Sequence, residues 1–162
     1  MFAGSSNAVN LTDGMDGLSS GVVILALIPY MIICLLQQRA GLAVFAASLL
    51  GALLGYLYYN KKPARIFMGD TGSLALGGVL AALAMITKTE LLLIVIAAVP
   101  VIETVCVIIQ QVAVRTGHKK VFIYTPIHYA FRIKGMPEKN IVRMFWLVEA
   151  VFACIGILLY LF

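Results

Sequence analysis

Two short polar stretches carry residue types that could bind a metal ion or a phosphate. The stretch 66–73 contains an isolated acid, Asp70, among glycines and hydroxyl side chains. The stretch 7–17 places an amide or a carboxylate at every third position, at Asn7, Asn10, Asp13 and Asp16. A carboxylate is the hard oxygen ligand that Mg²⁺ prefers, with water and phosphate oxygens completing the octahedron. On its chemistry, Asp70 is the best single candidate for a magnesium ligand.

Each stretch also has a purely structural interpretation. Thr12 or Asp13 could be the N-cap of the helix that follows, and Asp70 could cap the next helix along the chain. The start of a helix would equally offer free N–H groups to a phosphate. A spacing of three drifts by about 60° per step around a helix, so only a break near Gly14 and Gly17 could gather the polar side chains. Capping and ligand binding both stay open.

The rest of the chain predicts an all-α, polytopic membrane protein. Its 162 residues are 62% hydrophobic and only 12% charged, with a mean hydropathy of +1.03, whereas about a quarter of the residues of a soluble domain are charged. Five apolar stretches are long enough, or nearly so, to cross about 30 Å of hydrocarbon at about 1.5 Å per residue. They are 20–36, 42–59, 73–87, 91–112 and 142–162, and we expect them to form a single membrane domain over 1–162.

The basic residues predict how this domain is oriented. If the five helices alternate, only Arg39 and Lys88 of the 12 basic residues fall on one side, and the others share the opposite side. The positive-inside rule then places Asp13, Asp16, Asp70 and a loop over 113–140 in the cytoplasm. A net charge of +5 is explained by these loops and by anionic lipid, so we expect no nucleic-acid partner. Residues 1–10 lack the basic start and apolar core of a signal peptide.

Two acids lie inside the apolar stretches, at Glu103 and Glu149. A carboxylate in a membrane helix is a functional hypothesis by default. For Glu103 a functional role and a hydrogen-bonded packing role are about equally favoured, and for Glu149 packing is preferred. Breaks in the helices are expected at Pro29 and Pro100. Close helix contacts are expected at four small residues: Gly51, Gly55, Gly77 and Gly78.

Three motifs together resemble one enzyme family. The segments Asn-Ala-Val-Asn-Leu-Thr-Asp-Gly-Met-Asp-Gly-Leu (7–18) and Ile-Phe-Met-Gly-Asp-Thr-Gly-Ser-Leu-Ala-Leu-Gly-Gly (66–78) resemble signatures of the polyprenyl-phosphate N-acetylhexosamine-1-phosphate transferases. The segment Thr-Pro-Ile-His-Tyr-Ala-Phe (125–131), the following Lys-Gly-Met-Pro-Glu (134–138) and Glu-Thr-Val-Cys-Val-Ile-Ile-Gln (103–110) resemble the muramoyl-pentapeptide branch. The resemblance covers essentially the whole chain.

This resemblance implies a reaction at the cytoplasmic face of the bacterial inner membrane. Phospho-MurNAc-pentapeptide would pass from UDP-MurNAc-pentapeptide to undecaprenyl phosphate, giving lipid I and UMP, in peptidoglycan synthesis. The cofactor implied is Mg²⁺, and the lipid phosphate would attack the β-phosphate of the nucleotide. The partners implied are these two substrates, membrane lipid, and a second copy of the chain or a completing N-terminal half.

The resemblance also assigns roles to particular residues. Asp70 matches the metal ligand, Asp13 matches a second essential acid, and His128 matches a catalytic position. Phe67 matches the ring that stacks on uridine, although its residue type and place equally suit an anchor at the membrane surface. The remaining matches are to substrate-binding positions: Asn7, Asn10, Gly14, Met15, Asp16, Asn60 and Gly69.

Two departures from the family pattern leave alternatives open. The family has a run of consecutive histidines where this chain has His128-Tyr129-Ala130, which admits a UDP-GlcNAc-using paralogue. The chain resembles only the C-terminal half of the family fold and contains no Asp-Asp pair, so we expect no turnover from it alone. It could instead be a noncatalytic nucleotide-sugar-binding subunit. A transporter that uses Glu103 and Glu149 as relay groups is the least favoured alternative.

Overall fold

A computed structural model describes residues 1–162 and is built entirely from helices. Five helices, α2, α3, α4, α6 and α8, are long and apolar enough to cross a membrane. The prediction of an all-α protein with five membrane-spanning helices is therefore confirmed. The helices are α1 (Phe2–Thr12), α2 (Leu18–Leu36), α3 (Ala40–Asn60), α4 (Gly69–Thr87), α5 (Leu93–Ile96), α6 (Ala98–Arg115), α7 (Ile127–Ile133) and α8 (Glu138–Leu161).

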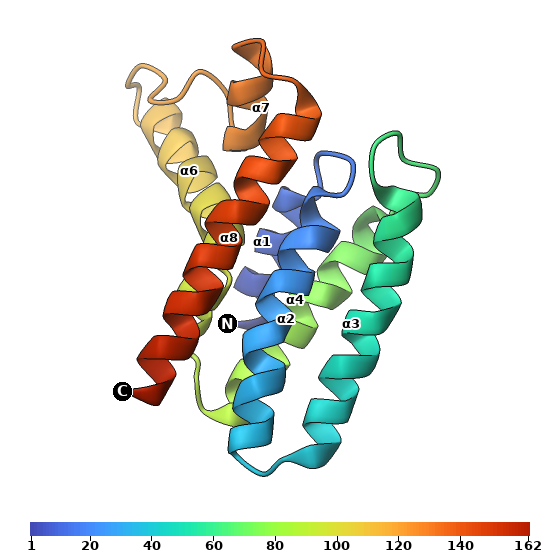
Figure 1. Ribbon diagram of the computed structural model, residues 1–162. Helices are drawn as coiled ribbons and strands as arrows, with labels where there is room; N and C mark the ends of the chain where they lie inside the picture. Colours follow the sequence, from blue (N-terminus) through green and yellow to red (C-terminus); the bar gives the residue numbers. More distant parts are fainter.

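The connections divide between the two ends of the bundle. The α1–α2 turn, the α3–α4 connection and the segment that contains α7 all lie at one end (Figure 1). The α2–α3 and α4–α5 connections lie at the other end, and they carry Arg39 and Lys88 (Figure 1). The predicted gathering of the other basic residues at one end is thus confirmed as geometry. Which side of a membrane this end faces stays a prediction.

Several boundaries differ from those predicted. Helix α4 begins at Gly69, four residues before the predicted start, and α8 begins at Glu138. The predicted helix over 91–112 is divided at Ala97 into α5 and α6. Because Pro100 has no N–H to give to the carbonyl four residues earlier, the ladder of hydrogen bonds is interrupted there. The predicted loop 113–140 is correspondingly shorter and contains α7.

The carboxylate of Glu149 stabilises this break. Its Oε2 accepts a hydrogen bond from the backbone N of Val99 at 2.9 Å, in the first turn of α6. Glu149 is fully buried, and a helix start inside the membrane needs such an acceptor because no water is there to replace it. The packing interpretation of Glu149 is confirmed.

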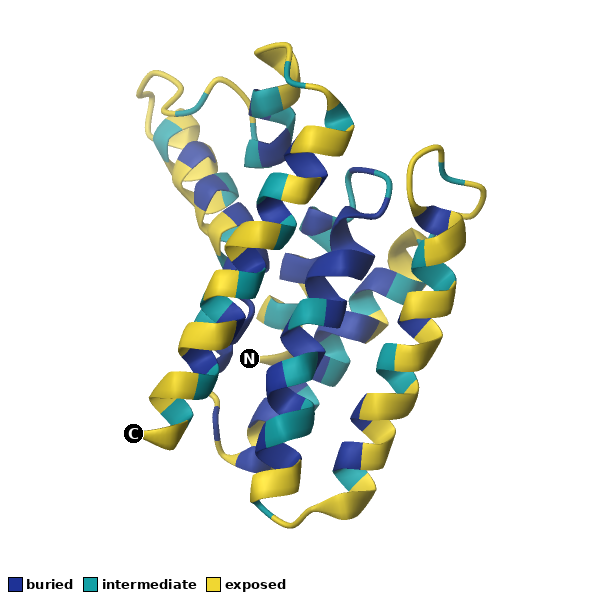
Figure 2. Ribbon diagram, viewed as in Figure 1, coloured by how far each residue is buried: buried dark blue, intermediate teal, exposed yellow.

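The centre of the bundle is α2, and α3 lies at its edge. In the apolar, membrane-crossing part of α2, 72% of the residues are buried inside the protein, whereas in that of α3 only 17% are buried (Figure 2). The side chains of Leu27, Tyr30 and Ile33 on α2 are fully buried. A Cβ added at Gly51 or Gly55 of α3 would meet no other atom within 4 Å. The predicted close packing of these two glycines is therefore wrong within this chain.

The short helix α1 packs closely against α4. Ser5 Oγ donates to the carbonyl of Gly77 at 2.7 Å, and Ser6 Oγ donates to the carbonyl of Leu74 at 2.5 Å. A Cβ at Gly77 would lie 2.3 Å from the Ser5 carbonyl oxygen, so only glycine permits this approach. The predicted close packing at Gly77 is confirmed. The same prediction for Gly78 is wrong, because a Cβ there would meet no other atom within 4 Å. This contact brings the end of α1 beside the start of α4.

Candidate functional site

The acidic corner, formed by Asn10, Asp13 and Asp70, lies where α1 ends and α4 begins. Asn10 Nδ2 donates to Asp70 Oδ1 at 3.0 Å and to Ser73 Oγ at 2.9 Å. The two polar stretches singled out in the sequence therefore meet, although Asn10 and Asp70 are 60 residues apart. Their meeting depends on the close packing of α1 on α4.

Asp13 is the more buried acid of this corner. Its Oδ1 accepts a hydrogen bond from Ser19 Oγ at 2.5 Å. Burial raises the pKa of Asp13 above its ordinary value; the Ser19 hydrogen bond opposes this rise, and the negative charge of Asp70 adds to it. Neither Asp13 nor Asp70 forms an ion pair. A bound cation would reduce the repulsion between the two carboxylates and would balance their negative charge.

The donor set of the acidic corner fits Mg²⁺ better than a transition metal. No group of three or more His, Cys, Asp and Glu side chains is placed to hold a metal ion. Mg²⁺ is commonly held by one or two carboxylates and keeps water or substrate phosphate in its remaining positions. Asp70, which is exposed, and Asp13 can supply those carboxylates, with the Asn10 amide fixing the orientation of Asp70.

The capping interpretation of these acids is wrong. Thr12 is the last residue of α1, and its hydroxyl donates to the carbonyl of Ala8 at 2.8 Å. The N-cap of α2 is Gly17, and the N-cap of α4 is Met68; neither helix start has a side-chain cap. Asp70 is the second residue of α4, one position inside the helix. Its carboxylate is therefore not used to close the helix end.

The His128 corner, formed by Glu103, His128 and Gly14, is the second polar group at this end. Glu103 accepts hydrogen bonds from the backbone N of Ile127 at 2.6 Å, the backbone N of His128 at 3.2 Å and His128 Nδ1 at 2.9 Å. Glu103 and His128 are fully buried. Two of these three hydrogen bonds come from backbone N–H groups, for which Glu103 is the acceptor. The open question about Glu103 is thereby answered, because it holds the imidazole and the start of α7.

Gly14 fits against the other edge of the imidazole. A Cβ at Gly14 would lie 2.3 Å from His128 Nε2, and Nε2 is buried with no hydrogen-bond partner. Tyr129 Oη donates to the carbonyl of Gly14 at 2.9 Å. The 125–131 segment therefore holds the turn that follows Asp13. The sequence motif predicted His128, but Tyr129 was noted only as a departure from the family pattern.

Asn60 joins three segments of the chain. Its Oδ1 accepts from the backbone N of Gly17 at 3.1 Å and from Ser20 Oγ at 3.0 Å. Its Nδ2 donates to the carbonyl of Ile66 at 3.0 Å. Asn60 is buried, so the structure gives it a positioning role between α2 and the loop that carries Phe67. Its predicted contact with substrate stays a prediction.

The other predicted substrate-binding residues differ in exposure. The Phe67 side chain is 78% exposed, and Gly69 follows it with φ +66°, a conformation that favours glycine. Met15 is buried in an apolar cluster with Leu18 and Val22. Phe67 therefore has a free ring, whereas Met15 is buried. The substrate contacts predicted for Phe67, Gly69 and Met15 stay predictions.

The side chains of Asp16 and Asn7 form no hydrogen bond with the acidic corner. Asp16 Oδ2 accepts from the backbone N of Ala64 at 3.1 Å, and its own N donates to Glu138 Oε1 at 3.2 Å. Asn7 Nδ2 donates to the carbonyl of Ala3 within α1 at 2.7 Å. Asn7 has no hydrogen bond to Asp70. The substrate contacts predicted for both residues stay predictions.

The whole sequence is similar to known proteins. Residues 1–88 match the profile of glycosyl transferase family 4. The chain is 47% identical over 158 residues to the phospho-N-acetylmuramoyl-pentapeptide-transferase of Desulforamulus reducens, covering 98% of this chain and 47% of that protein. Proteins of the same name from Rubrobacter xylanophilus and Bacillus thuringiensis are 46% and 48% identical over 100% and 97% of this chain, which covers 49% and 48% of each. The chain thus spans about half the length of these curated relatives.

Proposed function

The chain belongs to glycosyl transferase family 4, and from that membership we propose that it supplies the metal- and nucleotide-binding part of a phospho-N-acetylmuramoyl-pentapeptide transferase. The reaction would transfer phospho-MurNAc-pentapeptide from UDP-MurNAc-pentapeptide to undecaprenyl phosphate, with release of UMP. The observation that carries the proposal is the acidic corner. There Asn10 joins α1 to Asp70 by a hydrogen bond, and the neighbouring Asp13 forms no ion pair. The names and extents of the relatives support it.

The acidic corner would hold the diphosphate end of the nucleotide. Asp70 and Asp13 would hold Mg²⁺, and the chemistry that it would supply is neutralisation of charge on the phosphates. Asn10 fixes the Asp70 carboxylate through its 3.0 Å hydrogen bond. Phosphoryl transfer depends chiefly on positioning and on charge compensation, and these residues provide both without acting as a nucleophile.

The nucleoside end would lie along the turn 14–16 and the loop before α4. Phe67 presents an exposed ring suited to stacking on a base. The His128 corner holds this turn in place, because Gly14 packs against the imidazole and its carbonyl accepts a hydrogen bond from Tyr129 Oη. Asn60 holds the Phe67 loop by its bond to Ile66. His128 is thus a positioning residue in this arrangement.

The basic end of the bundle would face the cytoplasm of a bacterial inner membrane. Its excess of Lys and Arg over the opposite end, which carries only Arg39 and Lys88, supports that orientation. A water-soluble nucleotide would reach the acidic corner from that side, and the lipid phosphate would reach it from the membrane. A second copy of the chain would be compatible with this arrangement.

The proposal can be tested in a chimera that already has a working framework. In the Desulforamulus reducens relative, the segment that aligns with this chain would be replaced by this chain, and Mg²⁺-dependent release of UMP would be measured with undecaprenyl phosphate. We expect turnover with UDP-MurNAc-pentapeptide and none with UDP-GlcNAc. Turnover with UDP-GlcNAc alone would favour the paralogue with the other sugar nucleotide. Nucleotide binding without any turnover would contradict the catalytic proposal and favour a noncatalytic subunit.

A further inference from the structure

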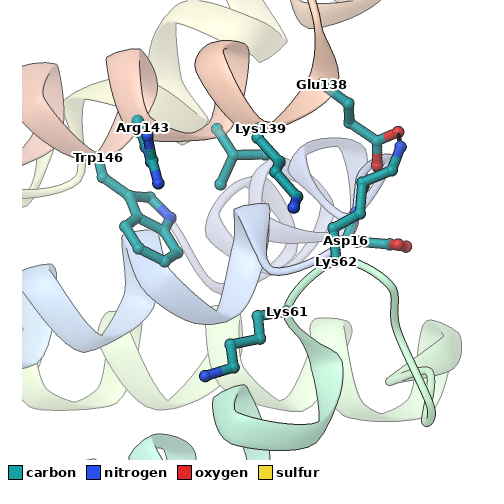
Figure 3. Close-up of a pocket in the computed structure, with 8 residues that line it drawn as sticks. Asp16, Lys61, Lys62, Glu138, Lys139, Arg143 and Trp146 are labelled. Carbon is teal, nitrogen blue, oxygen red and sulfur yellow. Dashed lines mark hydrogen bonds and ion pairs between the residues drawn. The ribbon is translucent and has the colours of Figure 1, made fainter.

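A basic hollow lies between the end of α3 and the start of α8, apart from the acidic corner. It encloses about 290 Å³. Lys139 and Arg143 extend into it from α8, and Lys61 lies across the opening from them on the α3 side (Figure 3). Lys139 and Arg143 are four residues apart, so they lie on one face of α8. Trp146, one turn further along the same helix, forms the end of the hollow (Figure 3).

The charges in this hollow are not balanced. Two acids and four cations line the hollow. Lys62 forms an ion pair with Glu138, and the Asp16 carboxylate accepts a hydrogen bond from the backbone N of Ala64 at 3.1 Å. Lys61, Lys139 and Arg143 take part in no ion pair. The Lys61 ammonium lies 4.8 Å from the centre of the Tyr58 ring, which is an attractive contact but leaves the charge uncompensated. Three cations therefore converge on a space large enough for a small anion.

The surroundings of the hollow are those of a membrane surface. A second hollow, of about 150 Å³, shares Lys61 and Lys62 and adds Tyr58, Tyr59 and Arg65. Aromatic rings mixed with Lys and Arg at the ends of membrane helices are typical of the headgroup level of a bilayer. Trp146 sits there with its Nε1 donating to the carbonyl of Gly17 at 3.2 Å. Both hollows thus lie where lipid headgroups would lie.

Apolar side chains continue from the hollows along the membrane-spanning part of the same two helices. Leu54 on α3 is 51% exposed, and Leu147 and Val151 on α8 are 68% and 57% exposed. A ligand with an anionic head and apolar tails would contact both the basic hollow and these apolar side chains. A free anion would contact only the cations of the hollow. Basic pockets of this kind between membrane helices bind anionic lipid headgroups.

We propose that the basic hollow binds the phosphate of an anionic phospholipid, whose acyl chains lie along the exposed faces of α3 and α8. The ligand chemistry is a phosphodiester on a lipid. This inference uses none of the acidic corner and does not depend on the transferase proposal, although Asp16 of the turn proposed for the nucleoside also lines the hollow. Such a site would fix the height of α3 and α8 relative to the membrane surface.

The test compares two variants of the full chain that remove equal charge. One carries Lys61→Gln, Lys139→Gln and Arg143→Gln. The control carries Arg115→Gln, Lys119→Gln and Lys120→Gln, three exposed basic residues of the 115–120 region at the same end. Retention of phosphatidylglycerol and of phosphatidylcholine would be measured by native mass spectrometry from mixed micelles, and helical circular dichroism would confirm that both variants fold.

We expect the wild-type chain and the control variant to retain phosphatidylglycerol in preference to phosphatidylcholine. In the hollow variant, the ratio of retained phosphatidylglycerol to phosphatidylcholine should fall by about tenfold to a hundredfold. Each basic residue near a membrane surface contributes about 1 kcal/mol of attraction to anionic lipid, and the variant removes three. An equal loss in the control variant would overturn the proposal, because the preference would then come from general surface charge. Competition by millimolar inorganic phosphate would also overturn it, because the hollow would then be a site for a free anion.

Discussion

The acidic corner and the His128 corner contain similar residue types at the same end of the bundle, yet they differ in how their polar atoms are satisfied. Glu103 is fully buried and accepts three hydrogen bonds from the start of α7. Asp70 is exposed and is held by a single amide donor from Asn10. The carboxylate of Glu103 is therefore used to hold structure, while that of Asp70 keeps one oxygen, Oδ2, without a hydrogen bond. The burial and the hydrogen bonds of the carboxylate, rather than its presence, separate a scaffold from a candidate binding site.

Asp70→Ala should give the largest effect on activity and almost none on folding. In the chimera, we expect kcat to fall by at least about 10²–10³, the usual loss when a charge-stabilising group is removed. Because the Asp70 side chain is exposed, the free energy of unfolding should change by no more than about 0.5 kcal/mol. Release of UMP and thermal unfolding in detergent measure the two quantities. If the variant lost activity only because it unfolds, Asp70 would be a structural residue like Glu103, and the comparison of the two corners would be wrong.

Glu103→Ala should give the largest loss of stability. Removing this carboxylate leaves the backbone N of Ile127 and of His128, and the imidazole Nδ1, buried without an acceptor. Each buried donor left without an acceptor costs about 1–3 kcal/mol, and the loss should appear as a clear fall in Tm. The matched control is Glu90→Ala, at an exposed acid of the opposite end. Equal Tm values for the two variants would show that Glu103 is not a scaffold residue.

Gly14→Ala should disturb the place where the two corners adjoin. The added methyl group would lie 2.3 Å from His128 Nε2, and the rigid, buried imidazole has little room to move. Overpacking of this kind costs about 1–3 kcal/mol. Gly41→Ala is the control, because a Cβ there meets no atom within 4 Å. We expect a lower Tm for the first variant and an unchanged or slightly raised Tm for the second.

Asp13→Asn should give the smallest change in stability, and it should raise Tm rather than lower it. The pKa of Asp13 is raised by burial and by Asp70, so the folded state binds the proton more readily than the unfolded state. The ionised carboxyl therefore costs stability above its raised pKa, and this cost disappears as the pH falls through that pKa. The neutral amide should raise Tm by a few °C at neutral pH, with a smaller gain at acidic pH. A variant with a lower Tm than the wild type at neutral pH would contradict this assignment.

Much of the fold could be predicted from the sequence because the bilayer restricts a long apolar segment to a helix. All five membrane-spanning helices were found from hydropathy and length. A break at Pro100 was expected, but the division into two helices at Ala97 was not. That division also depends on an acceptor from Glu149, a residue 50 positions away from the Val99 donor. Local sequence cannot show which distant carboxylate will meet a helix start.

The members of the acidic corner could be named from the sequence, but their arrangement could not. Asn10 and Asp70 meet because Gly77 lets α1 approach α4, and that contact is tertiary. The capping interpretation failed for the same reason, since helix α4 begins at Gly69 and not at Ser73. The double role of Glu103 was detectable only as an acid inside an apolar run. Its partners lie 24 and 25 residues further along the chain.

The central claim is that the acidic corner binds a divalent cation. Mn²⁺, which can replace Mg²⁺ at oxygen-ligand sites, would be titrated into the purified chain and followed by electron paramagnetic resonance. We predict that Asp70→Asn and Asp13→Asn each weaken Mn²⁺ binding at least tenfold, whereas Asp16→Asn leaves it within about twofold, since the Asp16 side chain forms no hydrogen bond with the corner and bonds to Ala64. Wild-type affinity for Mn²⁺ in the Asp70→Asn variant would contradict the claim.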